Sequence, residues 1–120
     1  MLSLALALSL ATSPPEVSRA LGEETISVQV GHAFSLGDAH ARVQMLLDYW
    51  NKAFGVRSEW VGERVWLQGQ VFGIALHAYF DIAANTVRAV AADPGWLRDN
   101  AKDYVKRKLQ KYLHPLYAEP

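Results

Sequence analysis

The sequence predicts a single α+β domain in which an antiparallel sheet carries two helices on one face, in the order β-α-β-β-β-β-α. Three observations lead to this prediction. The chain has 120 residues, of which 51% are hydrophobic, and this is enough for one core but not for two. Two stretches place apolar residues at helical spacing, and the stretches between them alternate like strands. Short turns between those strands favour a meander, and two amphipathic helices need a shared sheet face to bury their apolar sides.

Local signals predict the first strand and the first helix. Apolar residues at positions 26, 28 and 30 alternate with smaller or polar ones, which indicates a half-buried strand starting near Thr25. Ser35 is a favourable N-cap with Asp38 three residues later, and Gly55 stands where a left-handed C-cap is expected. Between these caps the apolar residues follow helical spacing and predict a buried stripe: Leu36, Ala39, Val43, Leu46, Leu47, Trp50, Ala53 and Phe54.

Alternation and turn residues predict four further strands. Gly62-Glu63 fits a two-residue hairpin turn with glycine first. Gly73 separates the next two strands, and Ala84-Asn85 supplies the last turn because asparagine tolerates positive φ. The predicted strands are residues 56–61, 64–72, 74–82 and 86–91.

The second helix is predicted to begin at Asp93-Pro94, an acidic N-cap followed by proline at the first helical position. Apolar residues from Leu97 to Leu116 follow one broad side of this helix, and basic residues cover much of the remainder. Pro115 marks its end, because proline cannot continue a regular helix.

Composition excludes several classes of function. Lys+Arg and Asp+Glu both number 12, so no net charge draws the chain to nucleic acid, and we expect no nucleic-acid partner. The absence of cysteine excludes disulfides, thiolate zinc sites and cysteine nucleophiles. No glycine loop that cradles phosphate is present, and we expect no cofactor.

The domain is predicted to span residues 25–117, with residues 118–120 as a tail and residues 1–24 as an apolar tail and linker. Residues 1–11 are nearly all Leu, Ala and Ser, but the first basic residue is Arg19, so the positive start of a secretory signal is missing. The apolar run is too short to span a bilayer, and a Ser-Pro-Pro stretch then breaks any helix. A degenerate signal peptide, a short apolar tail and an upstream extension all fit. We expect a cytoplasmic protein without an integral membrane span, and export is the alternative if the run acts as a signal.

The spacing of polar residues does not predict a metal or catalytic site. His32 and His40 flank the capping turn, but no His-x-x-x-His pair lies on one helix, so we expect no metal. His77, Tyr79 and Asp81 share one face of a strand. They fit either an acid–base trio or the solvated side of that strand, and we favour the second interpretation. No Gly-x-Ser-x-Gly elbow occurs, and we expect no enzyme activity.

Aromatic and basic residues supply a candidate contact surface. Trp60 and Trp66 flank the Gly62-Glu63 turn with different parity relative to their apolar neighbours, and this parity allows one indole to leave the core face. With a basic helix beside it, an exposed indole suits an anionic, lipid-coated or polymer-coated surface. The other interpretation, which we favour, is that both tryptophans plug the ends of the sheet and the lysines offset the helix dipole. The candidate residues are Lys102, Lys106, Lys108, Lys111, Trp60 and Trp66.

Several short motifs occur in an order that resembles one family. They are His32-Ala33-Phe34-Ser35-Leu36, Ala39-His40-Ala41-Arg42-Val43, Phe54-Gly55, Trp60 with Gly62-Glu63-Arg64, the Gly73 strand, Thr86-Val87-Arg88-Ala89-Val90 and Lys106-Arg107-Lys108-Leu109. From about Thr25 to Leu116 the chain thereby resembles the bacterial polyhydroxyalkanoic acid system proteins, also described as granule-region proteins. The order of elements also resembles a reduced helix-grip fold, in which a long C-terminal helix lies across a curved sheet.

The resemblance implies a non-enzymatic accessory protein of the polyhydroxyalkanoate storage system, which associates with granules or granule proteins. One alternative is a helix-grip-like binder of a small apolar ligand, which requires a cavity of several hundred Å³. A less favoured alternative is a hydrolase that acts on hydroxyalkanoate esters through His77, Tyr79 and Asp81.

Overall fold

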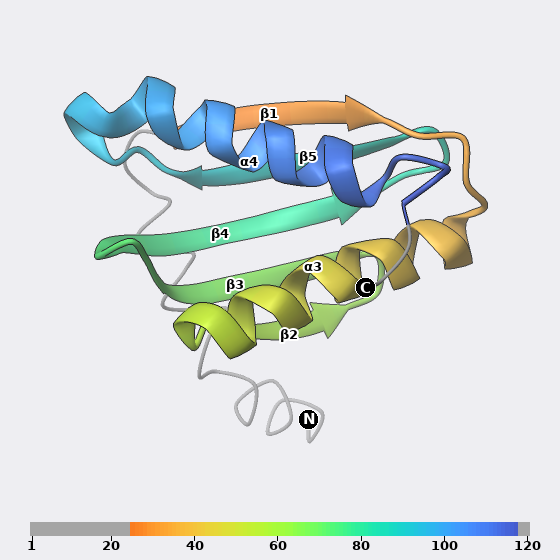
Figure 1. The fold of residues 1–120 in the computed structure, drawn as a ribbon, viewed down its shortest axis with the longest axis horizontal. Helices are drawn as coiled ribbons and strands as arrows, with labels where there is room; N and C mark the ends of the chain where they lie inside the picture. The colour runs from red at the N-terminus through yellow and green to blue at the C-terminus, as the bar shows by residue number, and fades with distance from the viewer. Residues whose placement is uncertain (1–24, 118–120) are drawn as a thin grey trace, which may run out of the picture.

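The computed structural model describes residues 25–117. The expected tail or signal peptide at residues 1–24 and the tail at residues 118–120 lie outside the described residues. The described part is a five-stranded antiparallel sheet with two α-helices, in the order β-α-β-β-β-β-α (Figure 1). The predicted single-domain α+β fold is therefore confirmed.

The sheet has the strand order β1-β5-β4-β3-β2, and every neighbouring pair is antiparallel. Strands β2 to β5 form the predicted meander, and β1 joins the free edge of β5 with Val28 opposite Ala89. The strands are β1 (Thr25–Gly31), β2 (Arg57–Val61), β3 (Arg64–Val71), β4 (Ile74–Ile82) and β5 (Thr86–Ala92).

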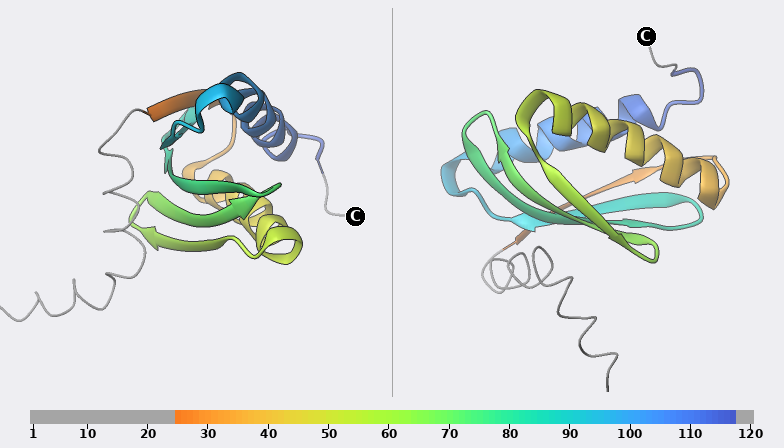
Figure 2. Two further views of the ribbon diagram at one scale, coloured as in Figure 1. Left: turned by 90° about the vertical axis from the view of Figure 1, so that its left-hand side faces the viewer. Right: turned by 90° about the horizontal axis from the view of Figure 1, so that it is seen from below.

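The helices α3 (Leu36–Phe54) and α4 (Arg98–Tyr112) cover one face of this sheet (Figure 1). Helix α4 lies over the β1 and β5 side, and α3 lies over the β2 and β3 side. Figure 2 shows both helices on the same side of the twisted sheet, so no helix among residues 25–117 covers the opposite face. Within residues 25–117, neither helix combines the length and the hydropathy needed to cross a bilayer.

Helix α3 has the caps that its sequence predicts. The Ser35 side chain accepts a hydrogen bond from the Asp38 N–H at 3.1 Å, which satisfies one of the unpaired donors of the first turn. Gly55 ends the helix with φ of 75°, a conformation that costs other L-residues about 1–2 kcal/mol. The buried residues of α3 are Ala39, Val43, Leu46, Leu47 and Trp50, and they pack on the sheet.

The strand register separates a core face from a polar face. On the helix side, Phe80 of β4 lies opposite Val65 of β3 and Ala89 of β5, and all three are buried. On the other side, Trp66 lies opposite Tyr79. The predicted alternation of β4 is therefore confirmed, because successive side chains of a strand point to opposite faces.

Helix α4 begins later than its sequence predicts. A 3₁₀ turn at Gly95–Leu97 precedes it, and the regular helix starts at Arg98. Asp93 lies just before the 3₁₀ turn, and its Oδ1 accepts a hydrogen bond from the Gly95 N–H at 2.8 Å. Gly95 has φ of 78°, which no α-helix contains, so Pro94 does not occupy a first helical position.

Two turn predictions also differ from the structure. Phe72 is not part of β3, because Phe72 and Gly73 form the two-residue turn into β4 with φ of 55° and 78°. Asn85 does not have positive φ. It contributes instead through its backbone carbonyl, which accepts a hydrogen bond from the His32 N–H at 2.8 Å.

Candidate ligand-binding pocket

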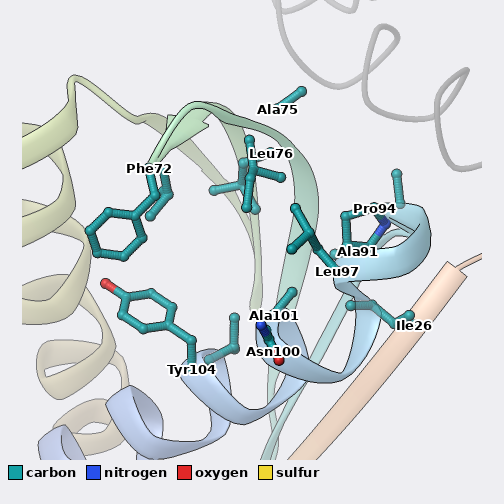
Figure 3. Close-up of a pocket in the computed structure, with 14 residues that line it drawn as sticks. Ile26, Phe72, Ala75, Leu76, Ala91, Pro94, Leu97, Asn100, Ala101 and Tyr104 are labelled. Carbon is teal, nitrogen blue, oxygen red and sulfur yellow. The ribbon is translucent and has the colours of Figure 1, made fainter.

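An apolar pocket lies between the first half of α4, the β3–β4 turn and the adjoining ends of β5 and β1 (Figure 3). Its volume of about 310 Å³ is at the lower end of the range that is usual for small-ligand sites. The lining residues are Ile26, Val71, Phe72, Ile74, Ala75, Leu76, Ala91, Ala92, Pro94, Leu97, Asn100, Ala101, Tyr104 and Val105.

The pocket exists because α4 is packed tightly at one end only. Ala101, Tyr104 and Val105 face the pocket from one side of the helix, as their spacing of three to four residues requires, and none of them is fully buried. In the second half of the helix, Leu109 and Tyr112 are fully buried. Several lining residues are alanines, whose short side chains leave the space below the first half of α4 unfilled.

The pocket lining contains no charged side chain. Its polar side chains are those of Asn100 and Tyr104. The Tyr104 hydroxyl accepts a hydrogen bond from Trp50 Nε1 at 3.1 Å. Burial raises the pKa of Tyr104, so the phenol stays neutral at physiological pH. Because a charged ligand group would find no opposite charge inside, the lining suits an apolar or neutral molecule.

Phe72 lies at the mouth of the pocket, since it lines the cavity and yet is 68% exposed. Its ring centroid is 5.1 Å from that of Phe54 and 5.5 Å from that of Tyr104. Figure 3 shows the Phe72 and Tyr104 rings next to each other, in an edge-to-face arrangement, with Leu97, Ala91 and Pro94 across the cavity. A positive φ of 55° costs a non-glycine residue roughly 1–2 kcal/mol, and two-residue turns of this kind favour Asn-Gly. An exposed aromatic side chain in a strained backbone position is an indicator of a functional role.

The two predicted tryptophans lie on opposite faces of the sheet. Trp60 packs on the helix side, where its Nε1 donates a hydrogen bond to Gln44 at 2.7 Å and its ring stacks on His40 at 4.4 Å. Trp66 lies on the sheet face opposite α3 and α4, with its ring centroid 5.3 Å from that of Tyr79. One indole therefore leaves the core face, which the parity of the two positions allows, and the pair does not form one surface.

The four predicted lysines are spread around α4. Lys102 and Lys106 border a surface hollow beside β1, and Asp99 and Asp103 border the same hollow. Lys108 lies on the α3 side, with its Nζ 4.7 Å from the ring centroid of Tyr49 and 5.7 Å from that of Tyr104. Lys111 lies near the end of the helix, where its Nζ is 5.9 Å from the ring centroid of Tyr112. Lys108 thereby contacts Tyr104, which lines the pocket.

The three residues considered for acid–base chemistry do not converge. Arg64 binds Asp81 through two hydrogen bonds of 2.7 and 2.9 Å, and its guanidinium lies 3.8 Å from the ring centroid of Tyr79. The hydrogen bond that Arg64 donates to Asp81 raises the pKa of Arg64, so the guanidinium stays charged. His77 is four residues from Asp81 along an extended strand, a separation of roughly 13 Å. The carboxylate therefore pairs with Arg64 and does not orient the imidazole.

The remaining histidines have structural contacts. His32 bonds the Ala83 carbonyl through Nε2 at 2.9 Å, and its Nδ1 accepts a hydrogen bond from the Phe34 N–H. His40 stacks on Trp60, as described above. Across residues 25–117, no three histidine, aspartate or glutamate side chains gather as they do around a metal ion.

The sequence interpretation included an apolar cavity only as an alternative and did not locate it, and it placed Phe72 in a strand. A signal for Phe72 was present, because Phe72-Gly73 stands between two alternating stretches where a hairpin usually has Asn-Gly. No such signal exists for the cavity, whose walls come from four separate parts of the chain. No model of a known protein family, no curated protein and no solved structure matches this chain.

Proposed function

We propose that this chain is a non-enzymatic binding protein that holds a small apolar molecule, or the apolar part of a larger one, below α4. The observation that carries the proposal is the cavity of about 310 Å³ without a charged side chain in its lining. An apolar cavity of roughly 150 Å³ accepts a benzene-sized molecule. This pocket therefore has room for a ligand of about twice that size.

The proposal assigns no reaction to the protein. Asp81 is bound by Arg64 on the sheet face opposite the pocket, so it is not in reach of a ligand below α4. Inside the pocket, the Tyr104 hydroxyl is kept neutral and already accepts a hydrogen bond from Trp50. Its chemistry suits a single hydrogen bond to a neutral oxygen of the ligand and does not suit a nucleophile, which needs an adjacent base.

A titration with butylbenzene, followed by NMR, tests the pocket. At about 0.5 kcal/mol for each of its roughly ten carbon atoms, butylbenzene should bind with about −5 kcal/mol, a Kd of about 0.2 mM. The substitution Ala101→Leu adds a branched side chain to the wall formed by α4. We expect it to weaken binding at least fivefold, because it occupies part of the cavity.

The matched control is Ala53→Leu, the same change at an exposed position of the other helix. This variant should bind butylbenzene as the unsubstituted chain does. Equal affinity for all three proteins, or shifts in the NMR spectrum confined to residues away from the pocket, would refute the proposed function.

Association with polyhydroxyalkanoate granules is our second proposal, and it rests on the sequence resemblance. The structural feature that favours it is the exposure of Lys102 and Lys106 on α4, where a surface of opposite charge can reach them. Fractionation of polymer-accumulating cells tests it. We expect the chain in the granule fraction, and a Lys102→Glu and Lys106→Glu double variant should be depleted from it. A chain found wholly outside the granule fraction would exclude this role.

A further inference from the structure

Four aromatic side chains form a continuous row that reaches the mouth of the pocket, where Phe72 and Tyr104 line the cavity. Tyr49 and Phe54 come from α3, Phe72 from the β3–β4 turn and Tyr104 from α4. Their successive ring centroids are 6.3, 5.1 and 5.5 Å apart. We call these four residues the aromatic rim. Lys108 lies next to it, with Nζ 4.7 Å from the ring centroid of Tyr49.

Two of the four residues of the aromatic rim are exposed where burial would be expected. Phe72 is 68% exposed and Tyr49 is 38% exposed, although aromatic side chains are usually largely buried. The positive φ of Phe72 adds backbone strain at the same position. Exposure and strain both raise the free energy of the folded chain in water, and both would be offset if the Phe72 ring entered an apolar phase.

We propose that the aromatic rim docks on an anionic phospholipid surface, from which an acyl chain passes into the pocket. This inference rests on the proposed binding function of the pocket. Aromatic rings suit the boundary between head groups and acyl chains, because they combine a large apolar surface with a polar edge or hydroxyl. Lys108 supplies a positive charge at the same place, for the phosphate groups of the surface. The pocket lining continues inward from Phe72 and Tyr104 without a charged residue, so a hydrocarbon chain meets no barrier.

Vesicle flotation tests the docking surface. The probes are vesicles of phosphatidylcholine alone and vesicles in which phosphatidylglycerol replaces part of it. We expect stronger binding to the anionic vesicles. Phe72→Asn should weaken binding to both kinds about tenfold, because it removes the exposed ring. The variant should stay folded, because Asn-Gly is the favoured sequence for this turn. Lys108→Gln should weaken binding about fivefold, on the anionic vesicles only.

The control is Val61→Asn, which removes an exposed apolar side chain at the β2–β3 turn, at the opposite end of the sheet (Figure 1). This variant should bind vesicles like the unsubstituted chain. Equal binding by the Phe72→Asn variant, or an equal loss for Val61→Asn, would overturn the docking surface. A third result would also overturn it: the chain binds no vesicles but self-associates, and Phe72→Asn abolishes the self-association. The aromatic rim would then contact a second copy of the chain. If the chain binds butylbenzene but no vesicles, only the docking surface is refuted. If it binds neither, the proposed ligand-binding function is refuted as well.

Discussion

Arg42 of α3 joins the two helices, and its replacement by leucine is expected to destabilise the fold strongly. Its Nη1 donates hydrogen bonds to the backbone carbonyls of Tyr112, His114 and Tyr117, at 3.4, 3.4 and 2.8 Å. Its guanidinium also lies 4.7 Å from the ring centroid of Phe34. A cation at this place interacts favourably with the last carbonyls of α4, which have no partner within the helix.

The size of the effect follows from these contacts. Only the 2.8 Å bond to Tyr117 is within the usual range for N–H···O hydrogen bonds, so the two bonds of 3.4 Å add little. A hydrogen bond from a charged donor contributes about 1.5–3 kcal/mol. The contact with the Phe34 ring adds about 0.5–1 kcal/mol. Arg42→Leu should therefore lower the free energy of unfolding by about 2–4 kcal/mol, or the Tm by roughly 10–20 °C.

Urea unfolding, followed by far-UV circular dichroism and tryptophan fluorescence, measures this loss. The matched control is Arg107→Leu, which removes an arginine whose ion pair with Asp103 is exposed, the two side chains being 64% and 66% accessible. Such surface pairs contribute less than about 0.5 kcal/mol. If Arg42→Leu costs no more than Arg107→Leu, the contacts of Arg42 do not hold the helices together and the reasoning fails.

Three further outcomes are expected. Gly55→Ala should lower the free energy of unfolding, measured with urea, by about 1 kcal/mol, because a positive φ at the C-cap is unfavourable for alanine. An unchanged urea midpoint would contradict this. Burial raises the pKa of Tyr104 in the folded chain. The contribution of the neutral phenol to stability is therefore complete below about pH 10 and is lost as the pH rises through the pKa that Tyr104 has in the folded state. In Tyr104→Phe, the free energy of unfolding should therefore fall less steeply at alkaline pH than in the unsubstituted chain. An equally steep fall would contradict this prediction. The hydrogen bonds from the Gly95 N–H and from Arg98 lower the pKa of Asp93. The contribution of this carboxylate to stability is therefore present above about pH 4 and is lost as the pH falls through the pKa that Asp93 has in the folded state. Between about pH 2 and 5, the free energy of unfolding of Asp93→Asn should fall less steeply with decreasing pH than that of the unsubstituted chain. Identical slopes for the two proteins would count against this prediction.

Helix α3 shows how far local sequence signals reach. Its two ends are determined by Ser35 and Gly55, and each cap acts within a few residues of chain, so the prediction needed no tertiary information. The Gly62-Glu63 turn was predictable for the same reason. The start of α4 was not, because Asp93-Pro94 suits a 3₁₀ turn as well as an α-helix and Gly95 decides between them.

The pocket lies beyond such signals because it is a property of packing. Lining residues such as Ile26 and Ala91 have the sequence pattern of ordinary core positions. The cavity appears only when β1 pairs with β5 and α4 crosses above them, and both relationships join distant parts of the chain. The separation of Trp60 and Trp66 was easier to predict, because it depends only on the alternation of side chains along two paired strands.

Since Leu109 and Tyr112 anchor only one end of α4, the opposite end should open to solvent more often. Amide hydrogens from Ala101 to Val105 are then expected to exchange with deuterium faster than those near Leu109. A molecule seated below the helix would slow the first group and leave the second unchanged. The amides near Leu109 thus serve as an internal reference for those of the first half of α4. Hydrogen–deuterium exchange could therefore report whether the pocket is occupied before the natural ligand has been identified.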